Sequence, residues 1–120
     1  MSDLQCPATF YVLGPGDGPG EEDAAPLPAG RDEARIALVR CAPGRAGLGE
    51  HLAGDLGCGV EVDESLAGDV RAVLVDIADL HRGESVVVLP ASAYPGRPPQ
   101  RWLRVRVDSH GPVAVVLGQP

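Results

Sequence analysis

The sequence predicts one small α/β domain over residues 1–120, with a mostly parallel sheet, flanking helices and a C-terminal antiparallel hairpin. Three patterns support this prediction. Residues 85–89 form a continuously apolar run, which is typical of a central parallel strand. Residues 66–81 repeat apolar side chains at helical spacing, which indicates a helix packed on a sheet. Residues 101–107 alternate with period two and turn back through residues 113–117, which predicts a β-hairpin.

The first third of the chain contains two predicted strands separated by a long loop. Residues 8–13 are typical of a strand, and residues 14–30 are dominated by Gly, Pro, Asp and Glu, which predicts a solvated loop. Residues 31–35 have room for one helical turn. Residues 36–39 form a short apolar run that fits a buried parallel strand, and residues 41–44 are expected to break it.

The middle of the chain alternates helices with strands. Residues 45–56 predict a helix with one leucine-lined face, and Gly57 and Gly59 are expected to end it. The leucines of that face are Leu48, Leu52 and Leu56. Residues 60–63 alternate like a half-buried strand. The two helices and the strands between them therefore build the layers expected of an α/β domain.

The clearest helix is expected over residues 66–81, ahead of the apolar strand. Its apolar stripe consists of Val70, Val73, Leu74, Ile77 and Leu80. His81 lies near the carboxyl end, where the helix dipole favours a cation, and Gly83 is expected to stop the helix. Residues 90–100 form a second proline-rich loop before the hairpin.

Composition excludes several classes of function. The formal net charge of −7 argues against nucleic acid or an anionic membrane as the main partner. All ten basic residues are arginine, which excludes Schiff-base chemistry on lysine. The cysteines at positions 6, 41 and 58 are odd in number and widely spaced, which favours reduced thiols in the cytoplasm. No secretion signal or membrane span is expected, and the Ala, Gly, Pro and Arg content suggests a GC-rich bacterial genome.

A glycine-rich turn follows the first strand, at the place where many α/β proteins bind a nucleotide. Residues 14–20 fail the dinucleotide-binding pattern because Pro19 stands at the sixth position. They also fail the P-loop pattern because no Gly-Lys-Ser/Thr follows, and two prolines remove backbone donors. The turn therefore does not predict a nucleotide site.

Four segments resemble those of one enzyme family. Residues 2–13 look like a first strand that normally runs into Arg-His-Gly-Glu, and residues 27–30 are similar to a Leu-Thr-x-x-Gly signal. Residues 41–46 look like a Ser-Ser-x-x-Arg-Ala turn, and residues 76–89 are similar to the helix and strand before a second catalytic histidine. In this order the chain resembles the histidine phosphatase superfamily, with its phosphoglycerate-mutase-like fold, and especially its small bacterial members.

The departures from that family concern its catalytic groups. Residues 14–17 read Gly-Pro-Gly-Asp where the family has Arg-His-Gly-Glu, and residues 90–92 read Pro-Ala-Ser where the second histidine is expected. Residues 67–69 replace the inserted lid, and only Arg45 matches a phosphate-contacting position. Because proline cannot attack phosphorus, we expect no phosphatase or mutase activity and assign no catalytic residue. The first long helix of the family also has no room here.

Arg45 and Asp17 are the candidate anion-binding residues. The Arg45 guanidinium and the free N–H groups of the first helical turn can converge on one oxyanion, and the alternative is a surface arginine. The remaining candidates for the lining of the same pocket are Gly14, Gly16, His51 and Tyr94. The acidic residues of the first loop could coordinate a cation, although such residues are usually solvated.

The histidines and the larger aromatic residues have less specific interpretations. His51, His81 and His110 are widely separated, so no metal site and no cofactor are expected, and each is interpreted as a solvated or capping residue. Tyr94 and Trp102 fit either the mouth of the former active site or a partner surface, and core packing is an equal alternative for Trp102.

Two functions remain open at this stage. The favoured one is a non-catalytic histidine-phosphatase-like module that binds a protein partner or a small anionic ligand. Loss of the lid and of a covering helix should expose one sheet face, which predicts a homo-oligomer or a heteromeric complex. The alternative is a repurposed small-molecule enzyme, for example of bacterial secondary metabolism, with Arg45 as anion clamp and Asp17 or His51 as acid or base.

Overall fold

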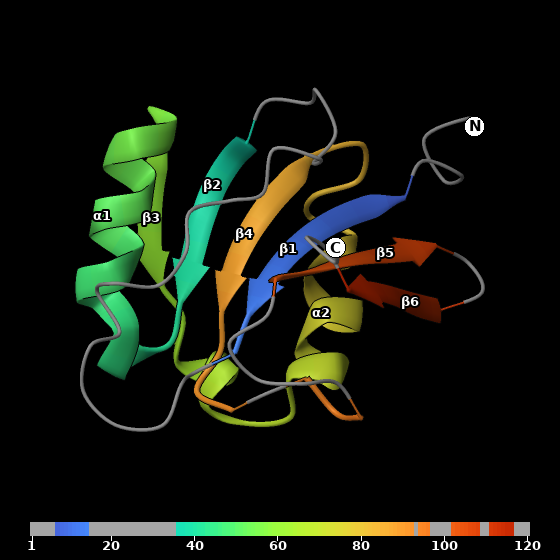
Figure 1. Cartoon of the computed structure of the whole chain (residues 1–120). Coiled ribbons are helices and arrows are strands. Elements are labelled where there is room, and N and C mark those ends of the chain that lie inside the picture. The colour runs from blue at the N-terminus through green and yellow to red at the C-terminus, as the bar shows by residue number, and fades with distance from the viewer. Residues whose placement is uncertain (1–6, 15–35, 93, 97–101, 109–110, 117–120) are drawn as a thin grey trace.

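The computed structural model describes residues 7–14, 36–92, 94–96, 102–108 and 111–116. Within them the strands form one six-stranded sheet in the order β3-β2-β4-β1-β5-β6 (Figure 1). The strands are β1 Ala8–Leu13, β2 Ile36–Cys41, β3 Gly59–Val62, β4 Ser85–Leu89, β5 Trp102–Asp108 and β6 Gly111–Val116. Strands β3, β2, β4 and β1 run parallel, whereas β5 runs antiparallel to β1 and β6 antiparallel to β5. The predicted α/β class and its C-terminal hairpin are confirmed.

The two central strands owe their positions to apolar side chains on both faces. All five residues of β4 and all six of β1 are buried. Continuously apolar strands are stable only where both faces of the sheet are covered, so β4 and β1 lie in the middle. The hairpin closes where Asp108 pairs with Gly111, whose φ of 103° is a backbone conformation that glycine adopts without strain.

The two helices cover opposite faces at opposite ends of the sheet. Helix α1, Ala46–Leu56, contacts β2 and β3, and helix α2, Val70–Ala78, contacts β5 and β6 on the other face. Alternate residues of β1 accordingly belong to different core clusters: Tyr11 packs on the α1 side and Phe10 on the α2 side. Helix α1 therefore packs mainly at the β3 end of the sheet, and α2 packs mainly at the β6 end.

Helix α1 follows the prediction closely. Leu48 and Leu52 are buried and Leu56 packs against the same cluster. Gly57 ends the helix with a φ of 73°, and its N–H donates to Ala53 O. Gly59, by contrast, does not end the helix but begins β3. The second strand is also longer than predicted, because Cys41 still pairs with β3 and β4.

The predicted helix over 66–81 is wrong at both ends. A short 3-10 segment, η4 (Glu64–Ala67), takes the first residues, and α2 begins only after Asp69, whose carboxylate accepts a hydrogen bond from Arg71 N. The helix ends at Ala78, so the chain leaves the helical spacing before Leu80, which is 67% exposed and does not belong to the buried stripe.

Two further expectations need correction. Strand β3 is exposed along its whole length rather than half-buried, because it is the edge strand of the sheet. His81 is only 7% exposed rather than solvated, because the turn after α2 places its ring on the sheet, edge-on to Phe10. The predicted loop over residues 15–30 and the helical turn over residues 31–35 lie outside the described residues.

Candidate functional site

Arg45 lies at the carboxyl ends of three adjacent strands. It ends a short 3-10 segment, η3 (Pro43–Arg45), that connects β2 to α1, and its side chain is buried. Its Nη1 donates to Leu13 O at 2.5 Å and to Pro90 O at 2.9 Å. Leu13 is the last residue of β1 and Pro90 comes directly after β4. The guanidinium therefore holds the carboxyl ends of β1, β2 and β4 together. Arg45 is therefore not the surface arginine that the sequence offered as the alternative to an anion-binding residue.

The same edge of the sheet brings together three of the positions on which the expected phosphatase resemblance was based. Gly14 is buried directly after β1, Arg45 follows β2, and residues 90–92 follow β4. The backbone reinforces this arrangement, because Ala42 N donates to Leu89 O at 2.8 Å. Asp17 and Gly16, the other candidates of this edge, lie outside the described residues.

The other two described candidates for the Arg45 pocket, His51 and Tyr94, lie in different surroundings. His51 is 63% exposed on α1, and its Nε2 lies 3.6 Å from Asp55 Oδ2, one helical turn later. Tyr94 is buried in the core cluster on the α2 side of the sheet, where it lines a groove with Arg71, Pro95 and residues 112–114. Trp102 is also buried, in the cluster on the α1 side, which matches core packing.

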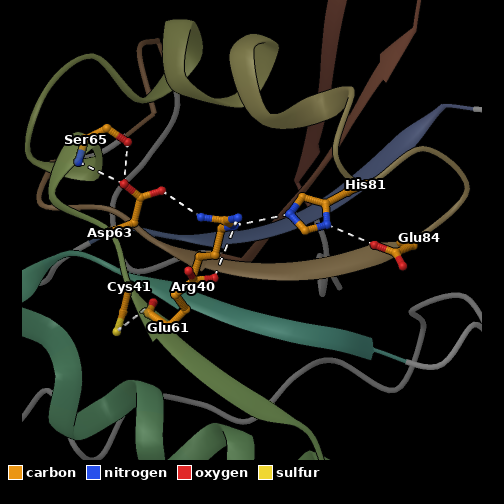
Figure 2. Close-up of polar contacts among 7 residues, drawn as sticks. All are labelled: Arg40, Cys41, Glu61, Asp63, Ser65, His81 and Glu84. Atoms are coloured by element: carbon orange, nitrogen blue, oxygen red, sulfur yellow. Dashed lines mark hydrogen bonds and ion pairs between the residues drawn. The ribbon is translucent and has the colours of Figure 1, made fainter.

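Among the described residues, one group of interacting charged side chains was not predicted from the sequence. It consists of Arg40, Glu61, Asp63, His81 and Glu84, and we call it the Arg40 network (Figure 2). Arg40 lies between two buried residues of β2 and is the one charged residue of that strand. This charge in an otherwise apolar strand is the feature of the sequence that could have indicated the group. The pairing with His81 spans 41 positions and depends on the fold.

Arg40 is the centre of this network. Its Nη1 donates to Asp63 Oδ2 at 3.0 Å, and its Nη2 lies 3.7 Å from Glu61 Oε1. Its Nε donates to His81 Nε2 at 3.2 Å, and His81 Nδ1 lies 2.9 Å from Glu84 Oε1. Because the Arg40 side chain is only 13% exposed, these contacts stabilise a charge that is mostly removed from water.

The environments of Asp63 and Cys41 shift their acidities in opposite directions. Burial alone would raise the pKa of Asp63, but the hydrogen bonds from Ser65 and the charge of Arg40 together hold that pKa below its ordinary value. Burial, assisted by the Glu50 carboxylate, raises the pKa of the Cys41 thiol against the opposing charge of Arg45. The Cys41 thiol is therefore a poor nucleophile at neutral pH.

One face of β5 and β6 carries an exposed apolar pair beside two arginines. Val113 and Val115 are 60% and 44% exposed, and the register pairs them with Arg106 and Arg104 respectively. Together with Asp108 these residues line a shallow groove of about 300 Å³. We call this surface the β5–β6 face.

Comparisons with known proteins add no relative. No family model matches the chain, and no curated protein or solved structure matches it. Among the described residues no group of three or more His, Cys, Asp and Glu side chains is placed to hold a metal ion. None of the described helices is long and apolar enough to cross a membrane.

Proposed function

We propose that the protein is a non-catalytic binding module of histidine-phosphatase-like descent, and that it works in the bacterial cytoplasm by binding a protein partner. The proposal rests on the chemistry at the carboxyl edge of the sheet. Pro15 and residues 90–92 stand where the family's nucleophile and second histidine are expected. The remaining phosphate-contacting arginine, Arg45, donates to two backbone carbonyls. Such a site holds strands together rather than attacking phosphorus.

The β5–β6 face is the surface we assign to the partner. It carries exposed apolar side chains beside charged ones, and α1 packs on the opposite end of the sheet. Val113 and Val115 offer apolar area to bury, and the charged side chains of Arg104, Arg106 and Asp108 beside them favour a partner with polar side chains around its own apolar contact. The partner is either a second copy of the chain or a different protein whose contact surface has this chemistry.

The proposal can be tested by measuring association of the purified protein and of two matched variants. Val115→Asp places a charge on the β5–β6 face, whereas Val62→Asp places the same charge on β3 at the opposite edge, where the valine is 51% exposed. Light scattering at micromolar concentration detects a homo-oligomer, and cross-linking in a lysate of the native host detects a heteromeric complex. We expect Val115→Asp to lose the association and Val62→Asp to keep it.

Two results would contradict the proposal. A wild-type protein that is monomeric and recovers no cross-linked partner does not act as a binding module. Equal loss in both variants would place the partner elsewhere. Small anions form a separate arm of the test: a rise in the melting temperature with phosphate or sulfate would instead favour a ligand-binding pocket near Arg45.

A further inference from the structure

The Arg40 network fixes where the protons of His81 lie. An arginine side chain is always charged and can only donate hydrogen bonds. Since Arg40 Nε donates to His81 Nε2 at 3.2 Å, that ring nitrogen must present its lone pair. The single proton of the neutral ring is then on Nδ1, from which it is donated to Glu84 Oε1 at 2.9 Å. His81 is therefore held as the neutral Nδ1–H tautomer.

Side chains from several described elements lie against the imidazole or act on it. Arg40 approaches Nε2 from β2, and Glu84 approaches Nδ1 from the turn before β4. Phe10 of β1 contacts the ring edge-on with 6.3 Å between centroids and carries no charge. The carboxylates of Asp63 and Glu61 act on the ring through Arg40, which they hold from β3 and the segment after it.

We propose that His81 is a proton-operated switch that couples the turn after α2 to β2 at neutral pH and releases it on acidification. A proton taken up from water at Nε2 converts the acceptor into a donor, which then faces Arg40 Nε. The Arg40 guanidinium and the His81 imidazolium then repel each other, and each points an N–H group at the other with no acceptor between them. The hydrogen bond between Arg40 and His81 must therefore break. Glu84 keeps its bond to Nδ1, so the imidazolium stays in place and the guanidinium withdraws toward Asp63.

The backbone determines which part of the fold responds. The turn after α2 stays attached to the start of β1, because Gly83 N donates to Pro7 O at 3.1 Å and Thr9 N donates to Glu84 O at 3.0 Å. The other end of the network holds the segment before α2, where Ser65 donates to Asp63 from its backbone N and its hydroxyl. Arg40 joins these two ends beneath α2, as Figure 2 shows. Protonation of His81 therefore uncouples the entry of α2 from its exit.

The experiment is nitrogen NMR of the uniformly labelled full chain between about pH 5 and 8, the range in which histidine changes charge. At the upper end of that range we expect His81 Nδ1 to resonate as a protonated nitrogen and Nε2 as an unprotonated one. We also expect a slowly exchanging Arg40 Nε–H signal. As His81 titrates, that signal should be lost at the same midpoint, while the backbone amide of Gly83 keeps its protection.

Two glutamine variants separate the switch from general effects of pH. In His81→Gln the amide oxygen can still accept from Arg40 but cannot be protonated, so the Arg40 signal should persist through the whole titration. His51→Gln removes an exposed histidine on α1 and should leave the wild-type behaviour unchanged. The proposal is overturned if His81 carries its proton on Nε2 at neutral pH, or if the Arg40 signal ignores its titration. The tautomer measurement needs only the wild type, and it is independent of the binding role proposed above.

Discussion

Gly49 and Gly54 lie on the same helix but face different surroundings, which makes them a matched pair for testing how α1 packs on the sheet. Gly49 is buried on the face that contacts β2 and β3, and Gly54 is exposed. A Cβ added at position 49 would lie 2.9 Å from Cys41 Sγ and 3.2 Å from Val60 Cγ2. A Cβ added at position 54 would meet nothing within 4 Å.

The size of the effect follows from two opposing terms. Replacing glycine by alanine inside a helix stabilises it by about 1 kcal/mol, and this gain is common to both positions. Carbon and sulfur atoms that are not bonded normally stay about 3.5 Å or more apart, so the new methyl at position 49 must displace Cys41 or the helix. Such overpacking costs about 1 to 3 kcal/mol. We therefore expect Gly54→Ala to stabilise the fold and the two variants to differ by about 1 to 3 kcal/mol.

Urea unfolding followed by circular dichroism measures both free energies of unfolding, and equal m values confirm that the variants unfold from comparable states. In a Cys41→Ala background the nearest clashing atom is gone, so the difference between the alanine variants should shrink. Equal stabilisation by Gly49→Ala and Gly54→Ala would refute the close contact of α1 with β2 on which the calculation depends.

Three further predictions concern the site residues. Arg45→Met should lower the free energy of unfolding by about 3 kcal/mol, because two buried carbonyls lose a charged donor, and Arg45→Lys should recover only part of this loss in the same urea titration. The pKa of Asp63 is lower in the folded protein than in the unfolded chain, so ionised Asp63 stabilises the fold above the unfolded pKa, and this stabilisation is lost as the pH falls through the folded-state pKa. Asp63→Asn should therefore flatten the dependence of the free energy of unfolding on pH below about pH 4. Burial raises the pKa of both Cys41 and Cys58, and mass mapping with a thiol reagent at neutral pH should find Cys41 the slower of the two because it is fully buried.

The sequence predicts the elements of this fold well and their ends less well. Periodicity and continuous apolar runs identify β1, β4, α1 and the hairpin, because burial on one or both faces dictates those patterns. The ends of α2 depend instead on single polar contacts, such as the hydrogen bond that Asp69 accepts from Arg71 N. An apolar side chain beyond such an end, like Leu80, continues the pattern in the sequence without sharing the buried face.

The candidate sites were harder to predict, because they depend on contacts between distant segments. Arg40 and His81 have unremarkable neighbours in the sequence, and only the sheet order places β2 beside β4 and the turn that precedes it. His51, by contrast, lies on the expected helix and is exposed beside Asp55, as its interpretation as a solvated histidine predicts. Its position and exposure follow from the local helical pattern, which needs no contact between distant segments.

Arg45 shows why an arginine at a position expected to contact phosphate is weak evidence for phosphate chemistry. A guanidinium at the carboxyl ends of parallel strands can bind an anion, but the same location also presents backbone carbonyls that lack a partner in the sheet. Here Leu13 O and Pro90 O accept from its Nη1, so the arginine satisfies buried acceptors whether or not a ligand binds. In a chain of the descent we propose, folding alone would retain this residue after the catalytic groups had gone. An arginine at the ends of parallel strands therefore indicates a ligand site only where its donors are not already used by backbone carbonyls, as those of Arg45 are.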